Sequence, residues 1–180
     1  MLTPMKEQQF NSFCRLMEVS FPPDERRPCE ELKALLKHPQ YTVYIVQEEA
    51  SATDIKAFLA VWQFTSFAFL EHFAVNPDCR CSGVGSAALN ELIGLLPVSL
   101  CLEAEPPTDA ICARRIGFYR RNGFYVNDYP YVQPPISHGK NPVPLLLLTY
   151  GAPVKIAEFR TIRNTLYHLV YHCSPPKDSV

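Results

Sequence analysis

The hydrophobic and polar positions of the first half of the chain predict two helices followed by three strands. Apolar residues recur every three or four positions over residues 6–19 and 30–37, as they do on surface helices. Residues 41–47, 55–64 and 67–75 are instead rich in β-branched and aromatic side chains, with short polar breaks between them. We expect these three segments to form an antiparallel meander.

The second half of the chain mixes helices and strands without a regular βαβ repeat. The predicted elements are a helix over residues 83–96, a strand over 98–102, a helix up to Asn122, and strands over 124–127 and 145–150. Pro97 stops the first helical pattern, Thr108 is expected to cap the second helix, and Gly123 is expected to take the left-handed position at its end. The order predicts an α/β fold with a mixed, mostly antiparallel central sheet flanked by helices.

A last helix is predicted over residues 157–173. Its apolar stripe consists of Phe159, Ile162, Leu166, Leu169 and Cys173. Such a stripe must be buried, either against the sheet domain or against a second copy of the chain in a homodimer, and the sequence leaves both arrangements open. We expect one domain over residues 1–152, followed by this helix and its tail over residues 153–180.

Composition and charge exclude several classes of protein. The chain has 180 residues with 47% hydrophobic content, and its 17 Lys and Arg against 18 Asp and Glu give a net charge of −1, so we expect neither a nucleic-acid nor a membrane partner. An apolar run long enough for a membrane span and the pattern of a signal peptide are both missing from the sequence, which predicts a cytoplasmic location. The seven cysteines contain no C-x-x-C pair, so we expect reduced thiols and no metal site.

The segment after Val75 is the most informative part of the sequence. A predicted strand ends there, the chain turns, and a predicted helix begins through Gly83 and Gly85. The first amides of a helix have no partner inside it, the helix dipole makes that end positive, and glycines let a pyrophosphate approach the backbone closely. The turn is therefore expected to bind a phosphate group without the help of a basic patch.

Two nucleotide-binding motifs are alternatives for this turn. Residues 83–88 fit the pattern G-x-G-x-x-A, and Glu103 ends the next strand, where a dinucleotide-binding fold places its ribose acid. However, seven residues separate Val75 from Gly83, whereas the dinucleotide fingerprint has its first glycine directly after the strand. A P-loop is excluded because no lysine follows either glycine.

Two motifs together resemble the GNAT acyltransferases, which bind the pyrophosphate of acetyl-CoA. Residues 80–85, Arg-Cys-Ser-Gly-Val-Gly, resemble the family signature R/Q-x-x-G-x-G/A, and residues 116–124 are similar to its F-Y-x-x-x-G-F segment. Their order and spacing make the pair more specific than either motif. The resemblance covers residues 41–124, and the strand over 145–150 suits the family's closing sheet. The last predicted helix goes beyond the minimal domain of the family.

The resemblance implies an N-acetyltransferase that moves an acetyl group from acetyl-CoA, its cosubstrate, to a primary amine by direct attack in a ternary complex. The pantetheine arm would pair with the strand before the turn, where Phe73, Ala74 and Val75 would hold the thioester. The phosphates would be bound by Arg80, Cys81, Ser82, Gly83, Val84, Gly85 and Ser86. An acyl-CoA-binding or partner-docking domain of the same fold, without catalysis, is the alternative.

Tyr119 matches the tyrosine of the family's second motif and would be the general acid for the coenzyme A thiolate. A phenol with a pKa of ~10 can protonate a thiolate of similar basicity. The alternative is a core tyrosine, because Tyr119 shares an apolar stripe with Cys112 and Ile116.

Glu71 would accept the proton of the amine, directly or through water. Its neighbours in the strand, Phe69 and Phe73, predict an apolar environment that raises the carboxyl pKa, although a salt-bridged or solvent-facing carboxylate is an equal alternative. His72 is expected on the opposite face of the strand as a satisfied, half-buried histidine. Glu103 and Glu105, at the end of the next strand, are alternatives to Glu71 and could also hold a cationic substrate, unless they belong to a solvated strand end.

The acceptor pocket is expected from the first two helices, the loop over residues 129–131 and the proline-rich segment up to Pro144. No motif in these segments identifies an amine. The acceptor could be a small molecule, a peptide N-terminus or a lysine side chain.

Overall fold

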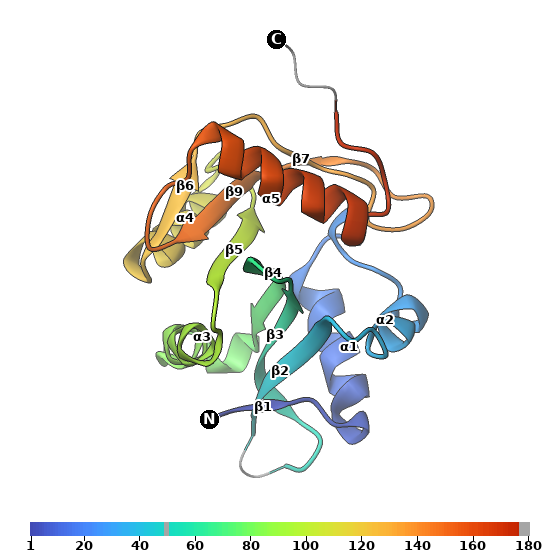
Figure 1. The fold of residues 1–180 in the computed structure, drawn as a ribbon. Coiled ribbons are helices and arrows are strands. Elements are labelled where there is room, and N and C mark those ends of the chain that lie inside the picture. The colour runs from blue at the N-terminus through green and yellow to red at the C-terminus, as the bar shows by residue number, and fades with distance from the viewer. Residues whose placement is uncertain (49–50, 177–180) are drawn as a thin grey trace. The chain divides into compact units, whose positions relative to one another are not determined.

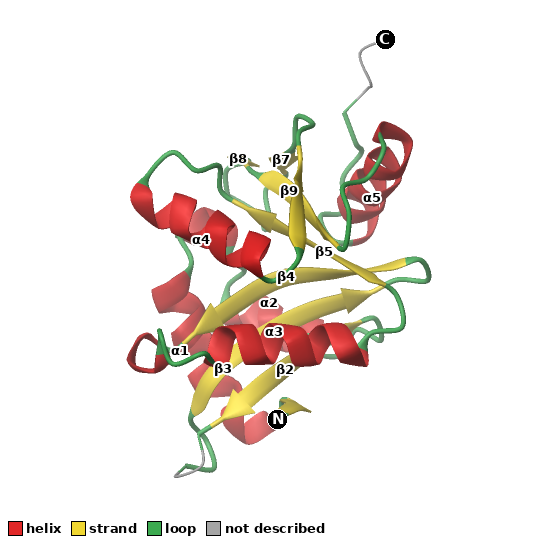
Figure 2. Cartoon of the chain, turned by 90° about the vertical axis from the view of Figure 1, so that its left-hand side faces the viewer, coloured by secondary structure: helices red, strands yellow, loops and turns green. Residues whose placement is uncertain are grey.

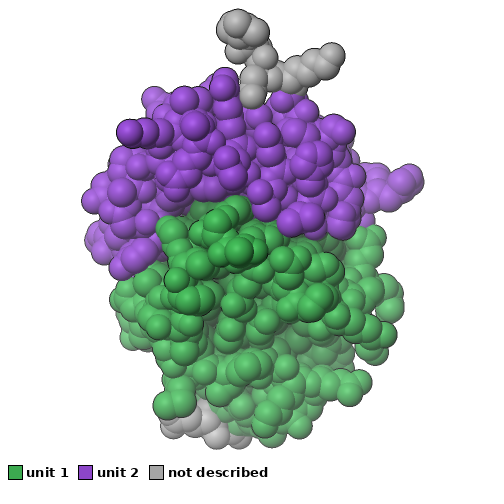
Figure 3. Space-filling view, viewed as in Figure 1, with its two compact units in different colours: residues 1–102 green, residues 103–180 purple. Residues whose placement is uncertain are grey.

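A computed structural model describes residues 1–48 and 51–176 (Figure 1). The chain forms two compact units, residues 1–102 and residues 103–180, which Figure 3 shows in green and purple. The expected division into a domain over 1–152 and a tail over 153–180 stays a prediction, and residues 177–180 of that tail lie outside the described residues.

The first unit is built on one sheet in which the strands lie in sequence order. They are β1 (Leu2–Pro4), β2 (Tyr41–Gln47), β3 (Ile55–Gln63), β4 (Phe67–Val75) and β5 (Ser99–Ala104), whose last two residues belong to the second unit. The pairings β1–β2, β2–β3 and β3–β4 are antiparallel, and β4–β5 is parallel. The predicted mixed, mostly antiparallel sheet is thus confirmed. A dinucleotide-binding fold is excluded, because its strands are parallel with helical crossovers.

Helices cover both faces of this sheet. The helical elements of the unit are η1 (Glu7–Gln9), α1 (Phe10–Ser20), η2 (Pro23–Glu25), α2 (Cys29–Leu35), η3 (Pro77–Cys79) and α3 (Val84–Leu95). Figure 2 shows α3 in front of the strands and α1 and α2 behind them. On the α1 face, the ring of Phe13 meets the ring of Phe58 on β3 edge-to-face at 4.8 Å, and both are fully buried. Each such ring contributes about 1.5–3 kcal/mol through burial.

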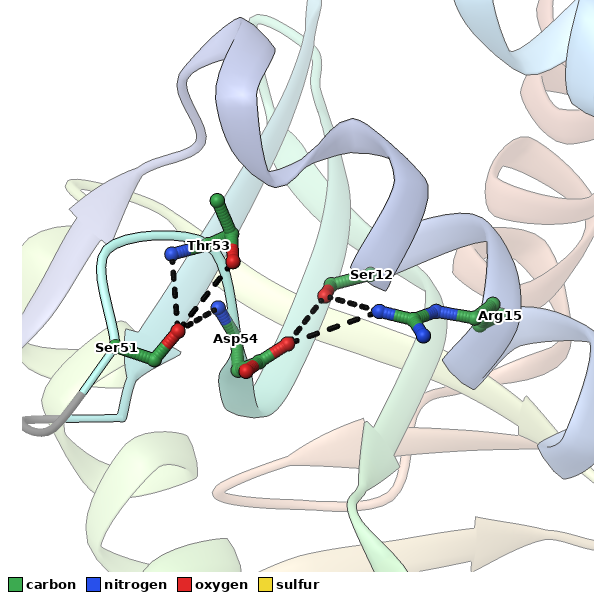
Figure 4. Close-up of polar contacts among 5 residues, drawn as sticks. All are labelled: Ser12, Arg15, Ser51, Thr53 and Asp54. Atoms are coloured by element: carbon green, nitrogen blue, oxygen red, sulfur yellow. Dashed lines mark hydrogen bonds and ion pairs between the residues drawn. The ribbon is translucent and has the colours of Figure 1, made fainter.

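Polar contacts tie α1 to the turn between β2 and β3 (Figure 4). The Ser12 hydroxyl donates to an oxygen of Asp54 at 3.1 Å, and Arg15 lies 3.7 Å from the same carboxylate. Within the turn, the Ser51 hydroxyl accepts hydrogen bonds from the amides of Thr53 and Asp54. Because both side chains of the Arg15–Asp54 pair are exposed, these contacts orient the helix more than they stabilise it.

Up to residue 176, the second unit holds two antiparallel strand pairs and two helices. Its elements are α4 (Ala110–Arg121), β6 (Phe124–Asn127), β7 (Val132–Gln133), β8 (Val143–Pro144), β9 (Leu146–Tyr150) and α5 (Ile156–Leu169), with β6 paired to β9 and β7 to β8. The predicted cap of α4 is wrong by one residue: Asp109, not Thr108, accepts the amides of Ile111 and Cys112. Both residue types are good N-caps, so the sequence could not choose between neighbours.

The last helix, α5, buries its apolar face within the second unit. Phe159, Ile162 and Leu166 are buried as predicted, and the ring of Phe159 lies 4.8 Å from that of Tyr129. The rest of the predicted stripe is wrong, because α5 ends at Leu169, which is 43% exposed, and Cys173 lies beyond the helix. A helix turns about 100° per residue, so Leu169 lies only about 20° from the buried Ile162, and its exposure follows from its place as the last residue of the helix rather than from its direction.

Among the described residues, the structure contains no helix with the length and apolar character that a membrane span requires.

Candidate functional site

Strand β4, which leads into the predicted phosphate-binding turn, contains a β-bulge. Ala60 of β3 pairs with His72 and Val61 pairs with Leu70, so Glu71 is an extra residue on β4. A bulge disrupts the ladder and redirects side chains. Accordingly, Nδ1 of His72 lies only 3.7 Å from the Glu71 carboxylate, and the prediction that strand alternation separates these two side chains is wrong.

Glu71 is a buried, salt-bridged carboxylate. Its side chain is 1% exposed, one oxygen pairs with Nη1 of Arg27, and the other accepts a hydrogen bond from Nε1 of Trp62 at 3.1 Å. Burial alone would raise the pKa of Glu71, but the positive charge of Arg27, together with the neighbouring His72, outweighs it and lowers the pKa to about 2. The prediction of a raised pKa is therefore wrong, and the salt-bridged alternative is correct.

His72 is satisfied at only one of its two ring nitrogens. Nε2 lies 2.7 Å from the carbonyl oxygen of Glu25 and therefore carries the proton that makes this bond. Nδ1 is buried and, within the described part of the chain, has no hydrogen-bond partner. The prediction of a histidine with its hydrogen bonds satisfied is thus correct for Nε2 and wrong for Nδ1.

Within the first unit, the paired stretch of β4 and β5 ends before the last residues of β4. The register of β4 with β5 covers Phe67 to Leu70, and residues 73–75 lie beyond it. The carbonyl of Val75 accepts a hydrogen bond from Nε of Arg80 at 3.2 Å, which ties the strand end to the turn that follows. An extended ligand can add to the edge of such a strand through main-chain hydrogen bonds.

The turn between β4 and α3 combines two left-handed residues with the start of a helix. Cys81 has φ +60° and Gly83, the residue before α3, has φ +84°. The Ser82 hydroxyl donates to the carbonyl of Cys79 at 2.5 Å and so closes the turn. Residues of alternating handedness turn successive amides toward one concave side, and a glycine offers no side chain to cap the helix. The arrangement is suited to an anion.

The structure brings together all seven residues predicted to bind phosphate. Arg80, Cys81, Ser82 and Gly83 are exposed in the turn, and Val84, Gly85 and Ser86 form the first turn of α3, half-buried. Their contact with a ligand stays a prediction.

Tyr119 lies on α4 in the second unit with its side chain in the core. Its ring packs edge-to-face on Phe118 and Phe124 at 5.4 and 5.7 Å, and Cys112 and Ile116 are buried on the same helix. Burial raises the pKa of Tyr119 to about 12, although Arg115 acts in the opposite direction. The phenol is thus a weaker acid than the sequence suggested.

The two other acidic candidates, Glu103 and Glu105, both have partners within the second unit. Glu103 accepts hydrogen bonds from the hydroxyls of Tyr131 and Tyr171, the latter at 2.7 Å, and Glu105 pairs with Arg115. Tyr131 belongs to the loop expected at the acceptor pocket. Tyr171 follows α5, and no spacing in the sequence pointed to its contact with Glu103.

Sequence reasoning also missed Arg27 and Trp62, the two partners of Glu71. The available signal for Arg27 was its place in a short segment between Pro22-Pro23 and Pro28, where the prolines restrict the backbone. For metal binding, the described residues contain no cluster of three or more His, Cys, Asp or Glu, and they form no disulfide.

The comparisons with known proteins agree on one family. Residues 39–126 match the model of the acetyltransferase (GNAT) domain. A protein from Bacteroides thetaiotaomicron assigned to the GNAT family of acetyltransferases is 30% identical, with 95% of this chain and 98% of that chain covered and a TM-score of 0.82. An uncharacterized N-acetyltransferase of Porphyra purpurea, ycf52, is 28% identical over 104 residues, which are 55% of this chain and 56% of that protein. The chain therefore matches just over half the length of this curated relative.

More distant solved structures share the fold. The ribosomal-protein-S18-alanine N-acetyltransferase of Escherichia coli is 18% identical, with 86% of this chain and 95% of that chain covered and a TM-score of 0.62. NAA60 of Arabidopsis thaliana, solved with acetyl-CoA, is 13% identical, with 83% and 97% covered and a TM-score of 0.65.

Proposed function

The chain belongs to the GNAT family of acetyltransferases, and on that premise we propose that it transfers an acetyl group from acetyl-CoA to a primary amine by direct attack in a ternary complex. The observation that carries the proposal is the turn from Arg80 to Ser86, which combines two left-handed residues with a helix start that no side chain caps. Such a site suits the pyrophosphate of acetyl-CoA.

Positioning is the largest proposed contribution to the rate. The turn would hold the pyrophosphate, and residues 73–75 of β4, beyond the pairing with β5, would hold the pantetheine arm and the thioester. Holding two reactants in line can supply ~7–11 kcal/mol of the barrier, whereas one general acid or base typically gives about 10²- to 10⁴-fold.

Tyr119 is proposed as the general acid for the leaving thiolate. With a pKa of about 12 it is protonated at neutral pH and can donate a hydrogen bond to sulfur. Full proton transfer to an ordinary thiolate of pKa ~8.5 is uphill by about 3.5 pH units, or about 5 kcal/mol. We therefore expect its effect to lie at the lower end of the range for general acids.

Glu71 is proposed to act through water. With a pKa of about 2 it is ionised at every pH at which an amine can be neutral. Direct transfer of a proton to it from an alkylammonium group of pKa ~10.4 is uphill by about 8 pH units, or ~11 kcal/mol. The carboxylate is thus better suited to orient a water molecule that carries the proton away than to store the proton itself.

The acceptor is proposed only by class, as a small-molecule amine or a peptide amine. A second candidate function, an acyl-CoA-binding domain without turnover, is favoured by one observation. Both proposed catalytic groups, Glu71 and Tyr119, are buried, and their pKa values lie far from neutrality. An active enzyme would need access of substrate or water to both.

Thermal unfolding with acetyl-CoA, coenzyme A and NAD, followed by thiol release with a panel of amines and peptides, tests the proposal. A ligand at 100 times its dissociation constant stabilises by about 2.7 kcal/mol, which is readily measured. We expect stabilisation by both coenzyme A compounds and amine-dependent thiol release. Stabilisation without thiol release for any acceptor would support the binding domain, and stabilisation by NAD alone would contradict both.

A further inference from the structure

Two adjacent arginines between α1 and α2 have different environments. The side chain of Arg27 is 7% exposed and pairs with Glu71, whose side chain is 1% exposed. Arg26 is 23% exposed and lies 3.9 Å from the carboxylate of Glu18, itself half-exposed. Arg27 is therefore committed to the β4 bulge, and Arg26 provides a matched comparison in the same segment.

The segment that carries Arg27 is joined to the bulge at a second point. The carbonyl of Glu25 accepts a hydrogen bond from Nε2 of His72 at 2.7 Å, and the ring of Phe21 packs edge-to-face on the His72 ring at 4.7 Å. Residues 21–27 thus contact both residues of the bulge, Glu71 through charge and His72 through a hydrogen bond and ring packing. This segment connects the two helices that we expect to border the acceptor.

Stability alone is a weak explanation for the buried pair. Replacing a buried ion pair by apolar side chains of similar volume is often neutral or stabilising, because desolvation of the two charges offsets their attraction. The Arg27–Glu71 pair also sits at the residue that breaks the regular pairing of β4 with β3. The position of this ion pair at the bulge indicates a role in the proposed acetyl-transfer site.

We propose that Arg27 is a positioning residue of the acetyl-transfer site, which fixes the Glu71 carboxylate on the bulge and holds the segment between α1 and α2 against β4. This inference rests on the proposed function. Arg27 acts through Glu71 and through the placement of the segment, so its removal should affect the acceptor more than acetyl-CoA, whose phosphates are proposed to bind in the turn that follows Val75.

The pH dependence of the reaction separates this role from a structural one. The charged or titratable groups that face Glu71 are Arg27, His72 on β4 and Tyr41 on β2, while Trp62 on β3 supplies an N–H. Tyr41 stays neutral because burial raises its pKa well above the usual value. Without Arg27, burial of Glu71 is no longer opposed by a neighbouring guanidinium, and protonation of Glu71 should move toward neutral pH.

The test compares Arg27→Met, Arg27→Lys and the control Arg26→Met in steady-state kinetics with acetyl-CoA and the best amine from the thiol-release panel. For Arg27→Met we expect kcat/KM for the amine to fall about 10-fold or more, with the acetyl-CoA Kd changed by less than about 2-fold. The acid limb of its pH profile should shift upward by one pH unit or more, since the pKa of Glu71 rises. Arg27→Lys should recover part of the loss. Arg26→Met, which removes the hydrogen bond to the Phe21 carbonyl and the contact with Glu18 but no contact with Glu71, should keep the acid limb of the wild type.

The double variant Arg27→Met/Glu71→Gln keeps the proposal testable if the single variant unfolds. The double variant removes both charges of the pair, and it is compared with the single variant Glu71→Gln. Both should have the same kcat/KM for the amine, and the double variant should lack the shifted acid limb of Arg27→Met. Additive losses, or an Arg27→Met enzyme with wild-type kinetics and pH profile, would overturn the role of Arg27. A wild-type protein that binds acetyl-CoA but acetylates no amine would instead overturn the proposed function itself.

Discussion

Replacing Gly83 with alanine isolates the backbone conformation of the proposed phosphate-binding turn. Gly83 has φ +84°, and a Cβ added there would have no heavy atom within 4 Å among its described neighbours. Gly94, near the end of α3, has equally open space but an ordinary φ. The two Gly→Ala substitutions therefore add the same methyl group without a clash, and only one of them strains the backbone.

The expected effect of Gly83→Ala follows from that strain. A residue with a Cβ in the left-handed region costs about 1–2 kcal/mol relative to its preferred conformation. If the strained turn is the conformation that binds, its population falls about 5- to 30-fold and the apparent Kd for acetyl-CoA rises by the same factor. Gly94→Ala should leave the Kd unchanged and stabilise the helix by about 0.5–1 kcal/mol, because alanine is the better helix former.

Isothermal titration calorimetry with acetyl-CoA measures both Kd values, and thermal unfolding measures both stabilities. Gly83→Asn adds a useful intermediate, since asparagine adopts the left-handed conformation more readily than alanine. A Gly83→Ala protein that binds acetyl-CoA as tightly as the wild type would refute the reasoning, as would an equal loss of affinity in Gly94→Ala.

Three further predictions concern single groups. Tyr119→Phe should lower kcat by about 10²-fold with an unchanged acetyl-CoA Kd, and an unchanged kcat would refute the role as general acid. Folding lowers the pKa of Glu71 from 4.5 to about 2, so the ionised carboxylate adds about 3 kcal/mol to the free energy of unfolding. This contribution is fully present above pH 4.5 and is lost as the pH falls through 2. Urea unfolding at pH 5 and pH 2.5 should show the loss in the wild type, and the Arg27→Met/Glu71→Gln variant should lack this contribution at both pH values. Gly123→Ala should destabilise by more than the ~1–2 kcal/mol of strain alone, since its Cβ would lie 2.9 Å from Cε2 of Tyr150, and an equal loss in Gly151→Ala would contradict this.

Elements with a long periodic pattern were predictable from the sequence, and elements held by tertiary contacts were not. The bounds of β2 and β4 agree with the prediction because seven and nine successive residues carry the strand signal. β1 was missed, since of its three residues only Leu2 is buried and such a short segment has no period. The same holds for β7 and β8, with two residues each.

The candidate site was predictable in its position along the chain but not in its electrostatics. The turn after Val75 carries a local signal, since glycines and a helix start are visible in the sequence. The ionisation of Glu71 depends instead on Arg27, 44 residues away, and on a bulge that strict alternation does not reveal. Tyr119 shows the same limit, because its acidity is set by how deeply the core encloses it.

The extra residue in β4 changes the phase of the strand halfway along its length. Deleting one residue there would mend the ladder with β3 and, in the same step, turn the side chains on one side of the deletion to the opposite face. Regular pairing along the whole strand would thus either turn the Glu71 side chain away from Arg27 or reverse the faces to which the side chains of the strand end point. Regular pairing with β3 would require one residue fewer in β4, whereas the contact between Glu71 and Arg27 requires the extra residue.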